Sequence, residues 1–363
     1  YYIAIMLLHK RVGEMSEKKK VKNAEYDVVV IGGGMSGICA ALAAARHGAR
    51  TALVHDRHVL GGNASSEIRM HICGASENLA KPDLEESGIL HEIMLDNKSR
   101  NDYYNFSIWD MVLFSTVKRQ KNLTVYLSTA MESCEMGEGS TIRSIDAYQL
   151  TTETHWKISG KVFIDCTGNA TLGYYAEAEF RTGSEGRDEF GEPDAPGQPN
   201  KERMGNTLLF KAVDRGHPVA FKKPDFARTF TEEELKYRTH SAVHGAQIKG
   251  EVDKAYVRMT SFSTSSVDYG YWWIELPGET DDIIDEYEQI RDELVSCIYG
   301  IWDHLKNGGD HGAENYDLEW VGMLPGSREG RRLIGDYILN ENDILSNRPV
   351  SYTHLRAHET LRH

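Results

Sequence analysis

Two apolar runs near the start of the chain predict buried strands of a parallel sheet. Residues 28–31 and 51–54 read Val-Val-Val-Ile and Thr-Ala-Leu-Val, without alternation of polar and apolar side chains. Such runs are typical of strands that are covered on both faces. Between them, the alanine-rich residues 38–46 predict a helix that ends before Gly48. Residues 26–56 therefore read as a strand, a helix and a second strand.

The turn between the first strand and the helix is rich in glycine. Gly32, Gly34 and Gly37 occupy the positions of the G-x-G-x-x-G fingerprint, which provide a tight turn, close approach to a pyrophosphate and close helix packing. The free N–H groups that begin such a helix favour phosphate. The alternative is a glycine turn with a purely structural purpose. The predicted dinucleotide-binding residues of this turn are Gly32, Gly33, Gly34, Met35, Ser36 and Gly37.

The fingerprint also expects an acid at the end of the second strand, where it binds a ribose. The expected position falls on His55, and Asp56 follows it. We favour Asp56, because a carboxylate can accept hydrogen bonds from two hydroxyls. His55 is the alternative, since neighbouring strand residues point in opposite directions, and Asp56 as an ordinary loop acid also remains open. Arg57 completes this set of predicted cofactor-binding residues.

Further patterns extend the sheet. Residues 110–119 have helical apolar spacing, and residues 123–127 read as another strand. Residues 131–159 alternate between apolar and polar side chains, which predicts a small antiparallel meander. Residues 161–165 then read as a strand that returns to the first sheet.

The second half of the chain has a different organisation. A segment rich in glycine, proline and charge, residues 181–203, predicts a loop or lid, and a new domain begins at about residue 207. Thr231 and Glu234 form a capping box before a helix directed towards His244. The remaining predictions are strands over residues 257–263 and 269–276, and an amphipathic helix over residues 283–305 that ends at Asn307-Gly308-Gly309.

Charge and cysteine content narrow the classes of function. The formal net charge of the 363 residues is -14, which argues against a nucleic-acid partner or an anionic membrane surface. The five cysteines include no C-x-x-C pair, which indicates a reducing, cytoplasmic setting and argues against an iron–sulfur cluster. We therefore expect no metal site.

Two later motifs carry a family resemblance. Leu60-Gly61-Gly62-Asn63 follows the second strand, and Thr167-Gly168 lies in the sequence Phe-Ile-Asp-Cys-Thr-Gly-Asn of residues 163–169. Together with the first glycine turn, they resemble the FAD-dependent oxidoreductases that are loosely grouped with the flavin subunit of heterodisulfide reductase. The resemblance covers about residues 26–349. It implies FAD as the cofactor, with Gly61, Gly62, Asn63, Thr167 and Gly168 in contact with it.

The resemblance also implies the architecture. We expect an α/β fold in which a Rossmann-like FAD-binding domain, of the two-dinucleotide-fold flavoprotein type, carries an inserted α+β substrate domain. The expected segments are a disordered extension (1–24), the FAD-binding domain with its meander (25–180), a loop or lid (181–205), the substrate domain (206–340) and a tail (341–363).

The predicted catalytic residues are three side chains in the segment that follows the glycine doublet. In enzymes of the resembled type, this segment runs beneath the flavin ring. Arg69 could bind an anionic substrate or stabilise the reduced flavin. His71 could exchange a proton near neutral pH, and Glu67 is the third candidate. The alternative is structural: Arg69 pairs with Glu67, and His71 is an inner histidine with satisfied hydrogen bonds.

The expected reaction is dehydrogenation of a small polar organic substrate, with hydride transfer to the flavin and an unidentified electron acceptor. Arginines within residues 325–332 favour an anionic substrate, and ion pairing is their alternative purpose. Trp272 and Trp273 suggest a platform for a sugar-like substrate, or simply core packing. Isomerisation or elimination with FAD, or an inactive fragment that only binds nucleotide, are the other possibilities.

Both ends of the chain look foreign to the protein. Met15 is the expected true start, because the apolar run of residues 3–8 is too short to span a membrane. Residues after about 350 resemble the translation of a sequencing adapter. We therefore expect the front part of a longer enzyme.

Overall fold

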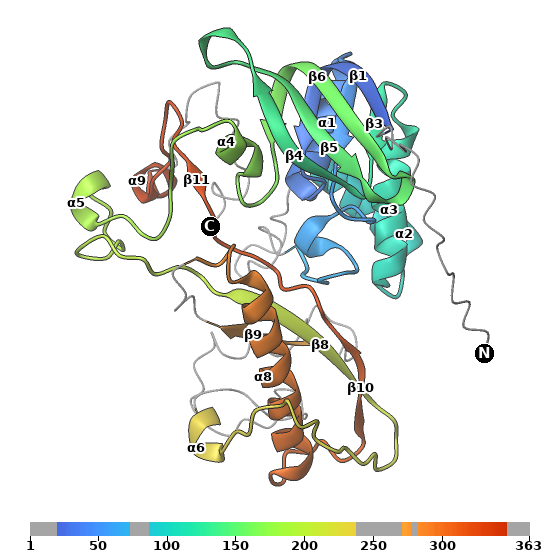
Figure 1. Ribbon diagram of the computed structural model, residues 1–363. Helices are drawn as coiled ribbons and strands as arrows, with labels where there is room; N and C mark the ends of the chain where they lie inside the picture. The colour runs from blue at the N-terminus through green and yellow to red at the C-terminus, as the bar shows by residue number, and fades with distance from the viewer. Residues whose placement is uncertain (1–19, 73–86, 237–270, 277–281, 347–363) are drawn as a thin grey trace, which may run out of the picture.

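The computed structural model describes residues 20–72, 87–236, 271–276 and 282–346, with only the backbone described for 271–276. These residues form two main sheets. Figure 1 shows a six-stranded sheet with helices on one side in its upper part, and a three-stranded sheet beside a long helix in its lower part. Among the described helices, none combines the length and apolar character that crossing a lipid bilayer requires.

The six-stranded sheet has the strand order β3-β2-β1-β6-β5-β4. Strands β3, β2, β1 and β6 are parallel, whereas β5 and β4 pair antiparallel at one edge. The predicted parallel sheet and the predicted meander are therefore parts of one sheet. The strands are β1 (Val21–Ile31), β2 (Thr51–Val54), β3 (Leu123–Tyr126), β4 (Thr129–Met136), β5 (Ile142–Gln149) and β6 (Thr154–Asp165).

The parallel strands are covered on both faces, as their apolar runs predicted. Val30 points towards helix α1 (Met35–Arg46) and packs with Ile38 and Leu42. Val29 and Ile31 point to the opposite face, where they belong to a second apolar cluster. This double burial explains why the strand sequence does not alternate.

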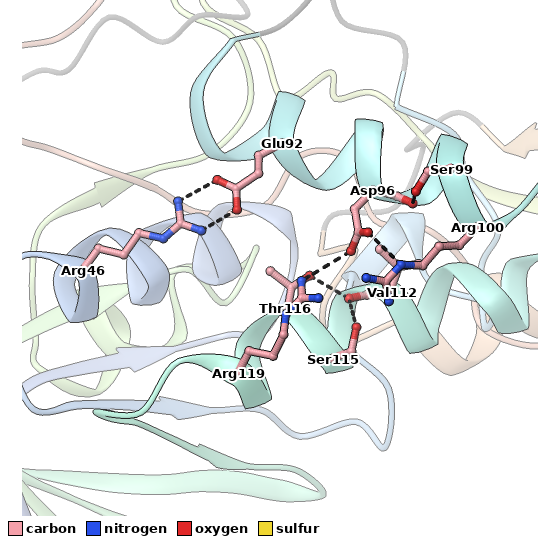
Figure 2. A network of polar contacts seen from close by, with 9 residues as sticks. All are labelled: Arg46, Glu92, Asp96, Ser99, Arg100, Val112, Ser115, Thr116 and Arg119. Carbon is pink, nitrogen blue, oxygen red and sulfur yellow. Dashed lines mark hydrogen bonds and ion pairs between the residues drawn. The ribbon is translucent and has the colours of Figure 1, made fainter.

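Helices α2 (Gly88–Arg100) and α3 (Phe106–Arg119) pack beside α1. Polar contacts join all three (Figure 2). Arg46 of α1 donates two hydrogen bonds, of 2.8 and 2.7 Å, to Glu92 of α2, and Asp96 of α2 lies 3.4 Å from Arg119 of α3. The helix predicted over residues 110–119 is thus confirmed as α3, which begins at Phe106 under a cap from the Asn105 side chain.

Two boundaries differ from the sequence-based expectation. Strand β1 begins at Val21, so residues 21–24 belong to the sheet and not to a disordered extension. Their partners are residues 155–158 of β6. Strand β6 is also continuous: its first half pairs with β5 while its whole length pairs with β1. The last strand of the predicted meander and the predicted returning strand are therefore one element.

The three-stranded sheet is antiparallel, in the order β10-β8-β9, with β8 (Asn206–Asp214), β9 (Tyr271–Leu276) and β10 (Tyr316–Val321). Helix α8 (Tyr287–Asn307) packs on it; it begins later than the predicted residue 283, and Gly308 caps its end, where the sequence predicted termination. The shared core contains Leu208, Phe210, Ala212, Ile290, Leu294, Ile298, Trp302 and Leu305.

Short elements complete the described chain: α4 (Thr171–Tyr175), β7 (Phe180–Arg181), α5 (Arg187–Phe190), α6 (Glu232–Leu235), β11 (Arg332–Leu333) and α9 (Glu341–Leu345), besides three 3-10 turns (Gly62–Ala64, Glu138–Ser140 and Leu150–Thr152). The capping box of Thr231 and Glu234 is confirmed at the start of α6. The predicted continuation of this helix to His244 and the predicted strand 257–263 lie outside the described residues. The first residues of the expected tail (341–363) are part of the fold. They form α9, which has its own capping box, and the Asn342 side chain donates a hydrogen bond to the Phe190 carbonyl.

Arg69 joins the two sheets and their helices. Its guanidinium carbon lies 4.0 Å from the ring centre of Trp320 in β10 and 5.8 Å from that of Phe106 in α3. The Arg69 backbone is left-handed, with φ of 68°, a conformation that disfavours side chains other than glycine. The cation–π contacts therefore hold a strained backbone in place between the two parts.

Substitution at Arg69 should separate these two effects. Arg69→Ala and Arg69→Gly both remove the cation–π contacts, worth about 0.5–2 kcal/mol. Glycine also relieves the left-handed strain of roughly 1–2 kcal/mol, so we expect Arg69→Gly to be the more stable variant by about 1 kcal/mol. Urea unfolding followed by circular dichroism measures the difference. Equal stability, or greater stability of the alanine variant, would contradict a strained Arg69 backbone.

Candidate functional site

A large cavity opens at the carboxyl ends of the parallel strands. Its volume is about 1120 Å³, and the last residues of β1, β2 and β6, Ile31, Val54 and Asp165, line it. Ligands of open α/β sheets bind at this edge. All the residues predicted from the sequence for cofactor binding or catalysis line the cavity except Gly37 and Arg69.

The glycine turn packs against the end of β6. A Cβ atom added at Gly32 would lie 2.1 Å from the Cys166 carbonyl oxygen, and one at Gly37 would lie 1.8 Å from the Gly32 carbonyl oxygen. Both positions therefore require glycine. Gly34 differs, because the nearest described atom to an added Cβ would be the Gly62 Cα, 4.0 Å away. The space beside Gly34 thus belongs to the cavity, as expected where a backbone must approach a ligand.

The N-terminus of α1 faces this space. Within the described residues, no side chain caps its first N–H groups, and its first turn contains no acid. Met35 and Ser36 of this turn line the cavity. Uncapped N–H groups and the positive end of the helix dipole suit an anionic group. The donors present here therefore fit the pyrophosphate of a dinucleotide.

His55 and Asp56 have different surroundings. The N–H of Gly33 donates to His55 Nδ1 at 3.0 Å, so the proton of the neutral ring lies on Nε2, which donates to the Val59 carbonyl at 3.0 Å. Burial lowers the pKa of His55 below its ordinary value, although the nearby Asp56 charge acts in the opposite direction. Both ring nitrogens are thus used within the fold, which argues against His55 as the ribose partner. The Asp56 side chain, 63% exposed, remains at the cavity wall.

In the turn after β6, polar groups form hydrogen bonds with one another. The backbone N–H and the hydroxyl of Thr167 both donate to Asp165 Oδ1, at 3.0 and 2.8 Å, and the same hydroxyl accepts from the N–H of Thr171 at 2.7 Å. Thr167 lines the cavity while both of its polar groups bond within the turn, and its predicted contact with FAD stays a prediction. Gly168 follows with φ of 83° and lines the cavity, so the turn contributes shape and backbone there.

The glycine doublet lies directly beside the first turn. The N–H of Gly61 donates to the Gly33 carbonyl at 2.8 Å, and a Cβ at Gly62 would lie 3.1 Å from the Gly34 Cα. Asn63 donates to the Ser327 carbonyl at 2.9 Å and so connects the doublet to the segment after β10. Gly61 and Gly62 also have positive φ values, of 114° and 58°.

Of the three predicted catalytic residues, Glu67 and His71 line the cavity. Glu67 lies 3.6 Å from the Nε atom of Arg57, so its ion-pair partner is Arg57 and not Arg69 as the structural alternative proposed. Burial raises the pKa of Glu67 above its ordinary value although the Arg57 charge acts in the opposite direction. A carboxyl group with a raised pKa in a cavity is a candidate for proton transfer.

Arg69 is not among the residues that line the cavity, so its catalytic role stays a prediction. Its guanidinium stacks on Trp320 and its Nε donates to the Ser66 carbonyl at 3.2 Å, outside the residues that line the cavity.

Helix α8 and the segment after β10 also line the cavity. Tyr287 donates to the Pro325 carbonyl at 2.7 Å, and burial raises the pKa of Tyr287 to about 12. Sequence reasoning missed Tyr287 as a site residue, because its spacing places it among the apolar positions of α8. The acidic residues that precede Tyr287 do not indicate a cavity either.

The arginine-rich segment divides between two purposes. Arg328 and Arg331 line the cavity. Arg331 stacks 3.9 Å from the ring centre of Tyr174 and donates to the Asn169 carbonyl at 3.3 Å. Arg332 instead pairs with Glu185 at 2.7 Å. The ion-pair interpretation thus holds for Arg332, whereas an anion site at Arg328 and Arg331 stays a prediction.

Comparisons with solved structures show distant similarities. The p-nitrophenol 4-monooxygenase PnpA of Pseudomonas putida DLL-E4 has 12% identity over 86% of this chain and 69% of its own, with a TM-score of 0.38. The myxobacterial FAD-dependent halogenase CndH has 16% identity over 55% and 46%, with a TM-score of 0.35. The L-proline dehydrogenase of P. horikoshii has 18% identity over 47% and 26%, with a TM-score of 0.26.

This chain thus spans less than half the length of the halogenase and of the dehydrogenase. No match was found among curated proteins. The sequence does match one family, described as FAD dependent oxidoreductase, over residues 27–353. That match covers both sheets, the cavity and α8. The chain therefore belongs to the FAD dependent oxidoreductase family, and its cofactor is FAD.

Proposed function

We propose that this enzyme dehydrogenates a small, polar, anionic organic substrate. When bound, FAD accepts a hydride from a substrate carbon and later passes the electrons to an acceptor. The observation that supports an anionic substrate is the presence of Arg328 and Arg331 among the residues that line the cavity. Membership of the heterodisulfide reductase group and a cytoplasmic location stay predictions.

The glycine-rich wall is the proposed FAD site. The N–H groups that begin α1, near Gly34, Met35 and Ser36, would hold the pyrophosphate, and Asp56 the ribose. Gly61, Gly62 and Asn63 run beside the first turn, where small residues let the backbone approach the cofactor. Gly168 would close the site from the end of β6.

Proton transfer is assigned to Glu67 and His71, the two predicted catalytic residues that line the cavity. The loss of a hydride from a substrate C–H leaves the proton of the neighbouring O–H or N–H to be removed. Burial raises the pKa of Glu67 and so brings it closer to the working pH of a general base. Arg57, at 3.6 Å, holds the carboxylate in position.

The three-stranded sheet with α8 is proposed to be the substrate domain. Tyr287 of α8 and residues 324–331 form the cavity wall that is left when the glycine-rich wall is assigned to FAD. Arg328 and Arg331 would bind the anionic group of the substrate. The prediction of a sugar-like substrate depends on Trp272 and Trp273, whose side chains lie outside the described part of the chain.

Gly34→Ala tests the cofactor site without disturbing the protein core. Gly34 has φ of -67° and ψ of -179°, which alanine adopts readily, and the added Cβ would enter the cavity. Overpacking against the pyrophosphate costs about 1–3 kcal/mol, which corresponds to roughly a 5- to 150-fold loss of FAD affinity. FAD titration of apoprotein, followed by fluorescence, measures the change.

The control for this test is Gly197→Ala, in an exposed loop where no described atom lies within 4 Å of the added Cβ. We expect the thermal stability of both apoproteins to remain near that of the original chain. Unchanged FAD affinity of the Gly34→Ala protein would show that the pyrophosphate lies elsewhere.

Glu67→Gln tests the proton acceptor through pH. If Glu67 must be ionised, kcat/KM falls as the pH decreases through its pKa, which lies above the ordinary glutamate value because of burial. The glutamine variant should therefore lose this acidic limb, along with a rate factor of about 10²–10⁴. Anaerobic flavin bleaching by a reactive donor from pH 4 to 9 provides the profile.

His71→Gln in the same assay separates the two residues. We expect a lower rate at every pH with the acidic limb retained. An acidic limb that persists in the Glu67→Gln protein would assign proton transfer to another group, and unchanged turnover of the His71→Gln protein would remove His71 from the mechanism.

Arg331→Met tests the charge of the substrate, with Arg332→Met as a matched neighbour. A hydrogen bond to a charged group contributes about 1.5–3 kcal/mol, so the Arg331 variant should bind the carboxylate probe oxalate about 10- to 150-fold more weakly. The Arg332 variant should bind it normally, because Arg332 pairs with Glu185. Perturbation of the flavin absorption spectrum reports binding. Equal affinities in the two variants would contradict the proposed anion site.

A further inference from the structure

A second cluster of polar side chains lies far from the FAD cavity, at the other end of α8. Among the described residues, Glu232, His304 and His311 place one ligand atom each within 4.8 Å of the others. Glu232 Oε2 lies 3.0 Å from His304 Nε2 and 3.7 Å from His311 Nε2. The two imidazole rings are 4.7 Å apart, with an angle of 41° between their planes.

The hydrogen bond on the far side of His304 determines which nitrogen faces the cluster. Nδ1 lies 3.1 Å from the carbonyl oxygen of Phe230, which can only accept, so Nδ1 carries a proton. In the neutral ring, Nε2 then presents a lone pair to the Glu232 carboxylate at 3.0 Å. Two lone pairs at this distance repel each other, unless Nε2 is protonated or a metal ion binds both atoms. Histidines that bind metals usually donate their other N–H to a backbone carbonyl in this way.

The distances suit a small tetrahedral cation. A zinc ion bound at ~2.0–2.1 Å holds neighbouring donor atoms about 3.3 Å apart. The distances from Glu232 Oε2 to the two imidazole nitrogens, 3.0 and 3.7 Å, lie on either side of this value, and all three donor atoms lie within 4.8 Å of one another. The Glu232 side chain is 68% exposed and can adjust, whereas those of His304 and His311 are only 5% and 11% exposed. Two buried nitrogens and a movable carboxylate leave a fourth position for water.

The turn after α8 brings the two histidines together. His304 lies in the last turn of α8, where the helix dipole favours positive charge. A Cβ at Gly308 would lie 2.6 Å from the His304 carbonyl oxygen, and one at Gly309 would lie 3.3 Å from His311 Nε2. Small residues at both positions allow the chain to fold back so that His311 lies beside His304.

We propose that Glu232, His304 and His311 bind a divalent cation of the zinc class. Two imidazole nitrogens and one carboxylate favour zinc or a neighbouring transition metal over magnesium and calcium, which prefer oxygen ligands. The ion connects the start of α6 to the end of α8, which lie side by side in Figure 1. This proposal departs from the expectation of no metal site.

The site is structural and separate from the redox centre. His304 follows Tyr287 by 17 residues on the same helix, which places it about 25 Å from the cavity wall. A cation there stabilises the three-stranded sheet with α8, because the site is complete only when α6 and α8 are folded against each other.

Zinc binding by the intact, FAD-loaded chain without an affinity tag tests the proposal. After removal of metals with a chelator and dialysis against a zinc buffer, elemental analysis should find one tightly bound zinc per chain. Replacement by Co²⁺ should give the visible absorption bands of four-coordinate cobalt. Zinc should also raise the Tm of the chain, by mass action on the folded state.

Glu232→Gln and its neighbour Glu233→Gln form the matched pair of variants. Both side chains are exposed, at 68% and 78%, so neither change should prevent folding. Loss of the Glu232 ligand should weaken zinc affinity about tenfold or more, since even partners that only orient ligands change it 10- to 100-fold. Glu233→Gln should bind zinc normally. His311→Gln provides a second ligand variant and should lose the cobalt bands.

Either of two results would overturn the proposal. One is the absence of stoichiometric zinc, with no rise in Tm, which would leave a protonated histidine pair with its carboxylate. The other is equal zinc affinity of the Glu232→Gln and Glu233→Gln proteins, which would place the metal on other histidines. The flavin spectrum should be the same with and without zinc, so loss of FAD cannot imitate either result.

Discussion

Direct contact between two backbone segments determines the geometry of the cavity. The turn of Gly32 and Gly37 lies so close to itself and to Cys166, at the end of β6, that no side chain fits at either glycine. This contact fixes α1 directly above the end of β1, with its uncapped N-terminus facing the space between the parallel strands. Gly33 then has defined partners: its N–H donates to His55, and its carbonyl accepts from Gly61. The glycine turn therefore positions the His55 side and the doublet side of the cavity together.

Much of the fold follows from local patterns, because burial acts on short stretches of sequence. The apolar runs of β1 and β2, the spacing of α8 and the capping box of α6 were all predictable in this way. Helix α2 was not predicted, since Ile93 is its one buried residue, so the helix shows no apolar stripe in the sequence. The start of β1 was missed for a related reason. Its first residues are largely polar and exposed, and they join the sheet through backbone pairing with β6.

The position of the candidate site could be predicted, but the use of individual side chains could not. The sequence indicates which residues follow each strand, and parallel strands bring these residues to one edge. It does not indicate that Thr167 bonds to Asp165, or that both nitrogens of His55 are used within the fold. Arg69 depends on Trp320, and Tyr287 on Pro325, across large separations in sequence. A residue type at a favourable position therefore predicts proximity to the cavity, whereas its chemistry depends on contacts between distant segments.

Helix α8 is the element through which the two proposed sites share one support. Its apolar stripe, including Leu294, Ile298 and Trp302, packs against β8 and fixes the rotation of the whole helix. The same rotation directs Tyr287 towards the cavity at one end and His304 towards α6 at the other. A loss of packing in the stripe would therefore disturb both ends together. Removal of an exposed group at one end leaves the apolar stripe intact. Such variants can therefore test the chemistry at each end of α8 without changing the stability of the helix.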